Sequence, residues 1–216
     1  MRILGLLVLC LALGACAGPS DVFDKGSPSS QPPQNVLIER WGDPPQNALA
    51  TVFADLRGQF VFKTNFGRRL DNISLTNPPG LADLMRFARS NVPRDTLVVV
   101  VTDQPLPPAS GRNNTPRHGV VWASERVMVV STVDIRFDST PAGPNLVSKM
   151  VLHMFGHALG IFQHIPDRYP SLMNDWRDDL KRLRQLPEDY DPRSLSHLSQ
   201  WLRTFSPTAR TPIIKP

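Results

Sequence analysis

The chain has 216 residues, of which 41% are hydrophobic and 20% charged, enough apolar material for one hydrophobic core. Its formal net charge is +5 at pH 7, but basic and acidic residues are interleaved, as in the run RDDLKRLRQ at residues 177–185. Such interleaving is typical of a solvated surface, and the sequence has no internal repeat and no nucleotide-binding glycine loop, so we expect no nucleic-acid partner.

The N-terminus has the pattern of an export signal, predicted over residues 1–15. Arg2 is followed by the apolar run ILGLLVLCLALGA, which ends in small residues and is too short to count as a membrane-spanning helix. The segment from Leu13 to Cys16 resembles a bacterial lipobox, in which the cysteine becomes the lipidated first residue of the mature protein. This resemblance implies a lipoprotein of the bacterial cell envelope, and Ala17 after the cysteine implies the periplasmic face of the outer membrane.

Composition then divides the remaining chain into three parts. Residues 16–35 are rich in Pro, Ser, Gly and Gln, which predicts a flexible tether behind the lipidated Cys16. Residues 36–205 are expected to form one domain, and residues 206–216 a disordered tail. Cys10 would leave with the signal, so the mature domain would contain no disulfide.

Hydrophobic patterns predict an α+β domain with the helices and strands in mixed order. The unbroken β-branched run at residues 96–102 predicts a strand buried on both faces. Shorter patterns predict the other elements before the active-site region: strands at 36–41, 59–63, 119–123 and 127–132, and helices at 43–57 and 81–90. Charged amphipathic patterns predict two more helices near the C-terminus, at 175–186 and 194–205.

Residues 151–173 carry the candidate functional site. His153 and His157 are four residues apart in an apolar segment, so on a helix their imidazoles project from one face and can bind the same ion. Gly160 favours the end of this helix, after which the chain can turn back and supply a third imidazole from His164. Three such ligands with a fourth position left for water suit a catalytic zinc ion.

The same segment resembles a known peptidase signature. The run HMFGHALG at residues 153–160, then His164 and the SLM turn at 171–173, resembles the metzincin motif HExxHxxGxxH with its downstream Met-turn, and FGHALG is similar to the matrixins. The resemblance implies a metzincin-like catalytic domain with a mixed twisted sheet, an active-site helix and a C-terminal helical part. It implies that Met173 packs beneath the metal, and that the strand before the active-site helix, taken as residues 127–132, is a sheet edge that pairs with an extended peptide.

Two positions depart from the motif. Met154 stands where the family has the glutamate that acts as general base. Gln163 stands where the family has its third histidine, so either the loop bulges by one residue to supply His164 or Gln163 is itself a weak carbonyl ligand. Glutamine is an uncommon zinc ligand, so His164 is the predicted third ligand.

These features together predict a zinc-binding metallopeptidase homologue that is catalytically impaired, because a thioether cannot accept a proton from zinc-bound water. It would act by binding an extended peptide or a protein, and we expect a monomer. One alternative is an active zinc endopeptidase with another base. A second is a copper-binding periplasmic lipoprotein, because Met150 and Met154 extend the histidine stripe with soft ligands at helical spacing.

Overall fold

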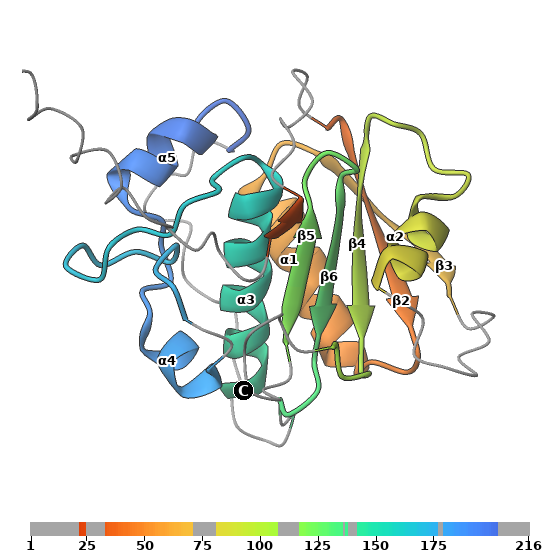
Figure 1. Cartoon of the computed structure of the whole chain (residues 1–216), viewed down its shortest axis with the longest axis horizontal. Helices are drawn as coiled ribbons and strands as arrows, with labels where there is room; N and C mark the ends of the chain where they lie inside the picture. Colours follow the sequence, from red (N-terminus) through yellow and green to blue (C-terminus); the bar gives the residue numbers. More distant parts are fainter. Residues whose placement is uncertain are drawn as a thin grey trace, which may run out of the picture.

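The protein is a six-stranded mixed sheet covered by helices on both faces, seen in a computed structural model (Figure 1). The structure describes residues 22–24, 33–70, 81–107, 117–135, 137, 142–176 and 179–202. The predicted signal peptide, Cys16 and the predicted tail lie outside these residues. Within them, no helix has both the length and the apolar character needed to cross a bilayer.

The sheet has the spatial order β1-β5-β6-β4-β2-β3. All neighbouring strands are parallel except β5 and β6, which form an antiparallel hairpin. The strands are β1 (Val22–Asp24), β2 (Asn35–Trp41), β3 (Lys63–Arg69), β4 (Thr96–Thr102), β5 (Gly119–Trp122) and β6 (Val127–Ser131). The mixed sheet predicted from the sequence is therefore present.

Five helices accompany the sheet in the described residues. The sheet divides the hydrophobic core into two layers, one on each face. The helices are α1 (Gln46–Gln59), α2 (Leu81–Arg89), α3 (Ala142–Ala158), α4 (Leu180–Gln185) and α5 (Pro192–Leu198). On β4, Val99 and Val101 pack in the cluster formed with α1 and α3, whereas Val98 and Val100 pack with α2 on the other face. Every residue of β4 is buried, so the predicted two-sided burial of this strand is confirmed.

The predicted strand at residues 59–63 was wrong. Helix α1 continues to Gln59, and Phe60 closes it by donating its backbone N–H to the Leu56 carbonyl at 3.3 Å. The neighbouring strand is β3, which begins at Lys63 and pairs in parallel with β2. Six of its seven side chains are exposed and most are polar, so it lacks the alternating pattern that marks a half-buried strand.

The prediction that residues 127–132 form an exposed sheet edge was also wrong. Strand β6 lies inside the sheet between β4 and β5, because the tight turn before Val127 folds β5 back onto its outer side. Arg126 in that turn has a φ of 55°. The short strand β1, which the composition assigned to a tether, pairs with β5 in turn. The two C-terminal helices, α4 and α5, are shorter than the segments predicted for them.

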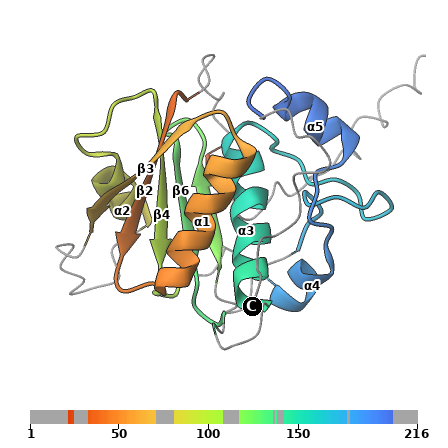
Figure 2. The ribbon, with the colours of Figure 1, turned by 180° about the vertical axis from the view of Figure 1, so that it is seen from behind.

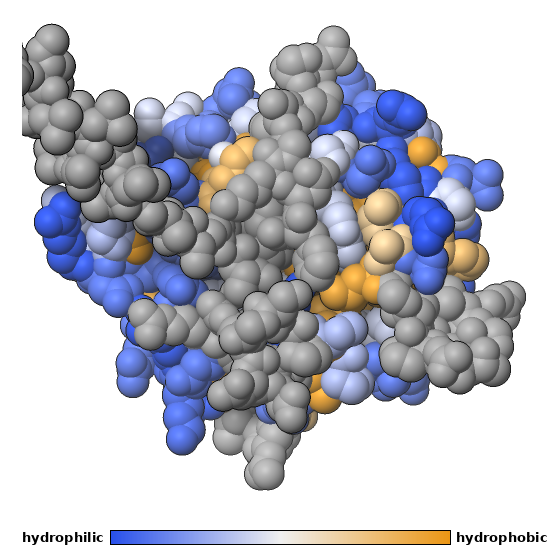
Figure 3. All heavy atoms as spheres, in the orientation of Figure 1, coloured by the Kyte–Doolittle hydropathy of each residue, from blue (hydrophilic) through white to orange (hydrophobic). Residues whose placement is uncertain are grey.

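The surface is mixed in character. Hydrophilic residues predominate among the coloured atoms of the face in Figure 3, and hydrophobic residues lie between them in small groups. Basic residues also pair with acids across the fold, as Arg182 does with Asp167 at 2.7 Å. This distribution is that of a solvated, charge-interleaved surface.

Candidate metal centre

Helix α3 carries the first two predicted ligands on its buried side. The rings of His153 and His157 are both fully buried. The helix ends at Ala158, and the chain turns at Gly160, which has a φ of 102°. Two backbone bonds close the turn: Gly160 N–H to the His157 carbonyl and Ile161 N–H to the Gly156 carbonyl, both 3.0 Å. This pair of bonds is the Schellman arrangement that glycine favours, and it sends the chain back along the helix.

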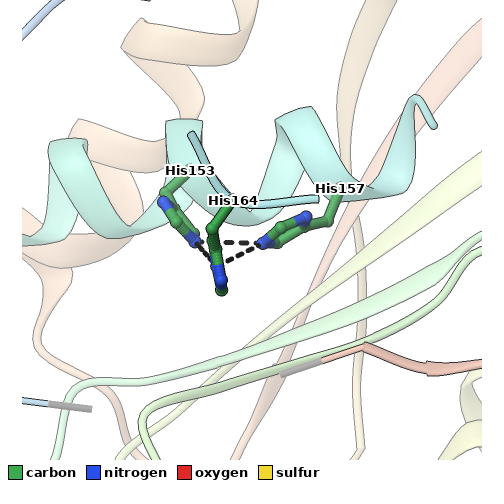
Figure 4. A group of neighbouring side chains, drawn as sticks. All are labelled: His153, His157 and His164. Carbon is green, nitrogen blue, oxygen red and sulfur yellow. Dashed lines mark hydrogen bonds between the residues drawn. The ribbon is translucent and has the colours of Figure 1, made fainter. Parts of the chain in front are cut away.

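The returning loop places a third imidazole beside the first two (Figure 4). The Nε2 atom of His157 lies 3.0 Å from that of His153 and 3.2 Å from that of His164, and the remaining Nε2–Nε2 distance is also 3.2 Å. Tetrahedral zinc with bonds of about 2.0–2.1 Å separates two ligand nitrogens by about 3.3 Å. The triangle therefore matches three ligands of one ion, and the group could hold a metal.

Backbone carbonyls orient two of the rings. The Nδ1 atom of His153 lies 2.8 Å from the Leu172 carbonyl oxygen, and that of His157 lies 2.5 Å from the Ile161 carbonyl oxygen. A carbonyl oxygen can only accept a hydrogen bond, so the Nδ1 atom of each ring is the donor, and the Nε2 atom is left to face the triangle as a ligand. Lone pairs only about 3 Å apart repel one another, and a cation between them removes that repulsion.

The third ring has a different neighbour. His164 keeps 13% of its side-chain surface exposed, and its Nδ1 lies 3.9 Å from Oδ1 of Asp175. Gln163 is exposed and lines a separate open cavity beside α5. Of the two residues that the sequence offered as third ligand, His164 is the one that the structure places with the other histidines.

The predicted Met-turn packs directly beneath α3. Met173 is fully buried, and its Sδ lies 2.6 Å from the point that a Cβ on Gly156 would occupy. Gly156 lies between the two helix histidines, so a side chain there would push against the turn. The turn also supplies the Leu172 carbonyl that orients His153. Its position is thus coupled to the ligand geometry through packing and one hydrogen bond.

Asn174, next to Met173, joins the turn to the loop that follows the third histidine. Its Oδ1 accepts a hydrogen bond from the Ser171 N–H at 2.8 Å, and its Nδ2 donates to the carbonyls of Ile165 at 2.8 Å and Tyr169 at 3.1 Å. Sequence reasoning did not single out this residue. A buried asparagine in a turn can satisfy several backbone groups at once, but nothing in the local sequence says which ones.

Met154, at the family's glutamate position, points toward the sheet. It is fully buried, and its Sδ lies 2.8 Å from the point that a Cβ on Gly119 would occupy at the start of β5. Of the acidic residues considered from the sequence, Asp167 pairs with Arg182 on the surface and Glu125 is exposed in the β5–β6 turn. Only Asp175 comes close to the triangle.

A further histidine lies on the strand side of the centre. His118 directly precedes β5 and is 4% exposed, and its ring centroid lies 5.8 Å from that of Trp176, which is itself 6.2 Å from the ring of His153. Burial lowers the pKa of His118, and the Asp134 carboxylate 3.8 Å from its Nε2 partly offsets that effect. Its imidazole is therefore neutral at pH 7. This residue lies far from the histidine motif in the chain, so the motif gives no signal for it.

Comparison with known proteins supports the class of fold. No family model and no curated protein matches this sequence. Solved structures do match it, and they give the chain the fold of the archaemetzincin zinc peptidases.

Three structures are similar over most of their length. The archaemetzincin of Methanopyrus kandleri has a TM-score of 0.58 at 17% identity, over 77% of this chain and 95% of its own. That of Archaeoglobus fulgidus, complexed with malonate, has a TM-score of 0.59 at 15% identity, over 75% and 99%. A zinc-dependent peptidase from Methanocorpusculum labreanum has a TM-score of 0.51 at 13% identity, over 74% and 99%.

Proposed function

We propose that His153, His157 and His164 bind one zinc ion, and that the protein is a matrixin-like, lipid-anchored homologue of the zinc metallopeptidases. The observation that carries this proposal is the triangle of Nε2 atoms, 3.0–3.2 Å on each side, with two rings oriented by carbonyls. Imidazole nitrogens suit zinc, and three of them leave a fourth position for water or substrate.

In this proposal the protein binds peptide and cuts it poorly or not at all. Bound zinc would polarise a carbonyl and acidify water. Met154 can neither accept a proton from that water nor return one to a leaving amine, and a positioned acid-base group typically contributes about 10² to 10⁴ in rate. The buried contact of Met154 with Gly119 supports this reading, because the thioether is part of the packing between α3 and β5.

The peptide would bind along β5, on the side of that strand away from β6. Strand β5 contacts α3 and lies one strand in from the margin of the sheet, where only the short strand β1 covers its outer side, so an extended strand could add there. Strand β1 pairs there in parallel, with Val22 opposite Val121 and Asp24 opposite Trp122. A strand of three residues offers few hydrogen bonds, so a longer peptide or a strand of a partner protein would replace it at low cost.

The lipid anchor completes the proposal. With Cys16 lipidated at the periplasmic face of the outer membrane, five residues separate the anchor from Val22 at the edge of the sheet. The six Cα–Cα steps from Cys16 to Val22 span about 20 Å when fully extended. While β1 is paired, this end of the sheet in a monomer would therefore stay close to the membrane, so a peptide or partner that displaces β1 would meet it there.

An active endopeptidase is the second candidate, because Asp175, beside the triangle, and His118, which packs on Trp176, are groups that could handle a proton. His118 is a buried neutral imidazole, and the Asp175 carboxylate lies beside His164. In that case the wild-type protein would cleave peptide, and the substitution His118→Gln or Asp175→Asn would abolish that cleavage without removing the metal.

The first test is metal content, measured by mass spectrometry on the full chain, its His164→Ala variant and the matched control Gln163→Ala. We expect about one zinc per chain in the wild type and in Gln163→Ala, and a loss of at least tenfold in affinity in His164→Ala, since two ligands hold zinc poorly. Loss of metal from Gln163→Ala instead would overturn the ligand assignment. Copper bound in preference to zinc, and lost in Met154→Leu, would favour the copper-binding alternative.

The second test is peptide cleavage with equimolar zinc, with and without a chelator. The proposal expects no chelator-sensitive cleavage by the wild type, together with measurable binding of extended peptides. Cleavage restored by Met154→Glu would show that the remaining machinery is intact, although the buried position makes the glutamate costly to accommodate. Wild-type cleavage at the rate of an ordinary zinc peptidase would refute the impaired reading and establish the second candidate.

A further inference from the structure

A cavity of about 470 Å³ lies at the opposite edge of the sheet from the metal centre, between α1 and strands β2 and β3. Figure 2 shows α1 crossing this face with β2 and β3 beside it. Its volume falls in the range of small-molecule sites. The site is therefore separate from the histidines and from the proposed peptide edge.

One part of the cavity is apolar and partly aromatic. Phe53 on α1 and Phe66 on β3 stack with their ring centroids 4.7 Å apart and 13° between their planes, and Ile38 and Leu49 extend this lining. Phe66 is 56% exposed, an unusual position for a phenylalanine. Because the two rings already cover each other, the remaining apolar surface is a ring face and aliphatic side chains, which suit an alkyl chain better than an inserted planar ring.

Another part of the cavity is cationic. Arg40 on β2 and Arg69 on β3 are register partners on adjacent strands, and both line the cavity. Arg68 lines the cavity as well; its Nε donates to the buried carboxylate of Glu39 at 3.0 Å, and its guanidinium lies over the ring of Phe87 on the α2 side. None of the described residues that line the cavity is acidic. Two guanidinium groups on one wall match a carboxylate, which accepts paired N–H bonds from arginine.

From this combination we propose that the cavity between α1 and the β2–β3 edge binds a fatty-acid-like molecule, with its carboxylate at Arg40 and Arg69 and its alkyl chain against Phe66, Ile38 and Leu49. The cationic groups fix the orientation of the ligand, and the apolar wall contributes affinity by removing alkyl surface from water. This binding does not depend on the metal centre.

The test is calorimetric titration of dodecanoate, below its micelle-forming concentration, into the full chain carrying Cys16→Ser, which blocks lipidation. We expect saturable binding of one molecule per chain. The double variant Arg40→Gln/Arg69→Gln and the single variant Phe66→Ser should each weaken binding at least tenfold with an unchanged circular dichroism spectrum. Arg86→Gln, on the other face of the sheet, is the matched control and should bind as the parent does.

Three ligand arms then identify the chemistry. Acetate and neutral dodecyl maltoside should bind at least tenfold more weakly than dodecanoate, because each lacks one half of the match. Adenosine monophosphate is the probe for ligands that combine an aromatic ring with a phosphate. If it binds more tightly than dodecanoate, the proposed fatty-acid class of ligand is wrong. Equal binding of dodecanoate by the double arginine variant, or no saturable binding by the parent, would also overturn it. His164→Ala should leave dodecanoate binding unchanged, so failure here is distinct from failure of the zinc proposal.

Discussion

Asp55 gives the clearest quantitative prediction. This carboxyl on α1 accepts a hydrogen bond from Ser148 on α3, and burial raises its pKa from 3.8 to about 6, with the Ser148 bond acting in the opposite direction. A carboxyl with a raised folded pKa binds its proton more tightly in the folded than in the unfolded state. Its contribution to stability is therefore best below pH 3.8 and is lost as the pH rises to about 6. A shift of about two units corresponds to about 3 kcal/mol of destabilisation at neutral pH.

Replacing Asp55 with asparagine removes the charge and keeps a group that can bond Ser148. We expect Asp55→Asn to raise the free energy of unfolding at pH 7.5 by about 2–3 kcal/mol, and to change it little near pH 4. Urea unfolding of both proteins at half-unit steps from pH 4 to 7.5 measures this difference. Asp83→Asn, at a side chain 58% exposed, is the control and should show no such trend. A variant that is less stable at pH 7.5, or a difference independent of pH, would refute the reasoning.

Two further predictions concern the Met-turn. Gly156→Ala should lower the free energy of unfolding by about 1–3 kcal/mol and weaken zinc binding, because its Cβ would lie 2.6 Å from Sδ of Met173; thermal unfolding and metal titration measure both effects. Gly58→Ala, in α1 with nothing within 4 Å of the new atom, is the control and should stabilise by about 0.5–1 kcal/mol, and a similar gain in Gly156→Ala would contradict the clash. Asn174→Ala should cost about 1–3 kcal/mol, because it leaves several backbone groups in the turn and loop without their partner. Hydrogen exchange at the Ser171 amide should accelerate in this variant, and unchanged protection there would argue against the role assigned to Asn174.

The sequence predicted elements well where local pattern and burial agree. Strand β4 was recognisable because every residue of a strand covered on both faces must be apolar or β-branched. Strand β3 was missed because it lies at the sheet edge with polar side chains, and its pairing with β2 comes from backbone bonds that any sequence can make. The position of β6 inside the sheet was missed for a related reason. The order of strands is set by packing between distant segments and is not written in any one of them.

The same distinction holds for the candidate centre. The spacing of His153 and His157 determined that both imidazoles share one helix face, since helical geometry fixes that relation. Ligand chemistry favoured His164 over Gln163 as the third ligand, but helical geometry could not fix its position, because a loop of a few residues can place either side chain inward.

The tertiary structure decided between them through contacts far apart in the chain. The Gly160 turn sets the direction of the loop, and Asn174, next to the Met-turn, donates to backbone carbonyls that follow the third histidine. The sequence by itself thus determined the kind of site and two of its residues. The third residue, the contact of Met154 with β5 and the arginine-lined cavity at the far edge exist only in the folded chain, because each depends on atoms that folding alone brings into contact.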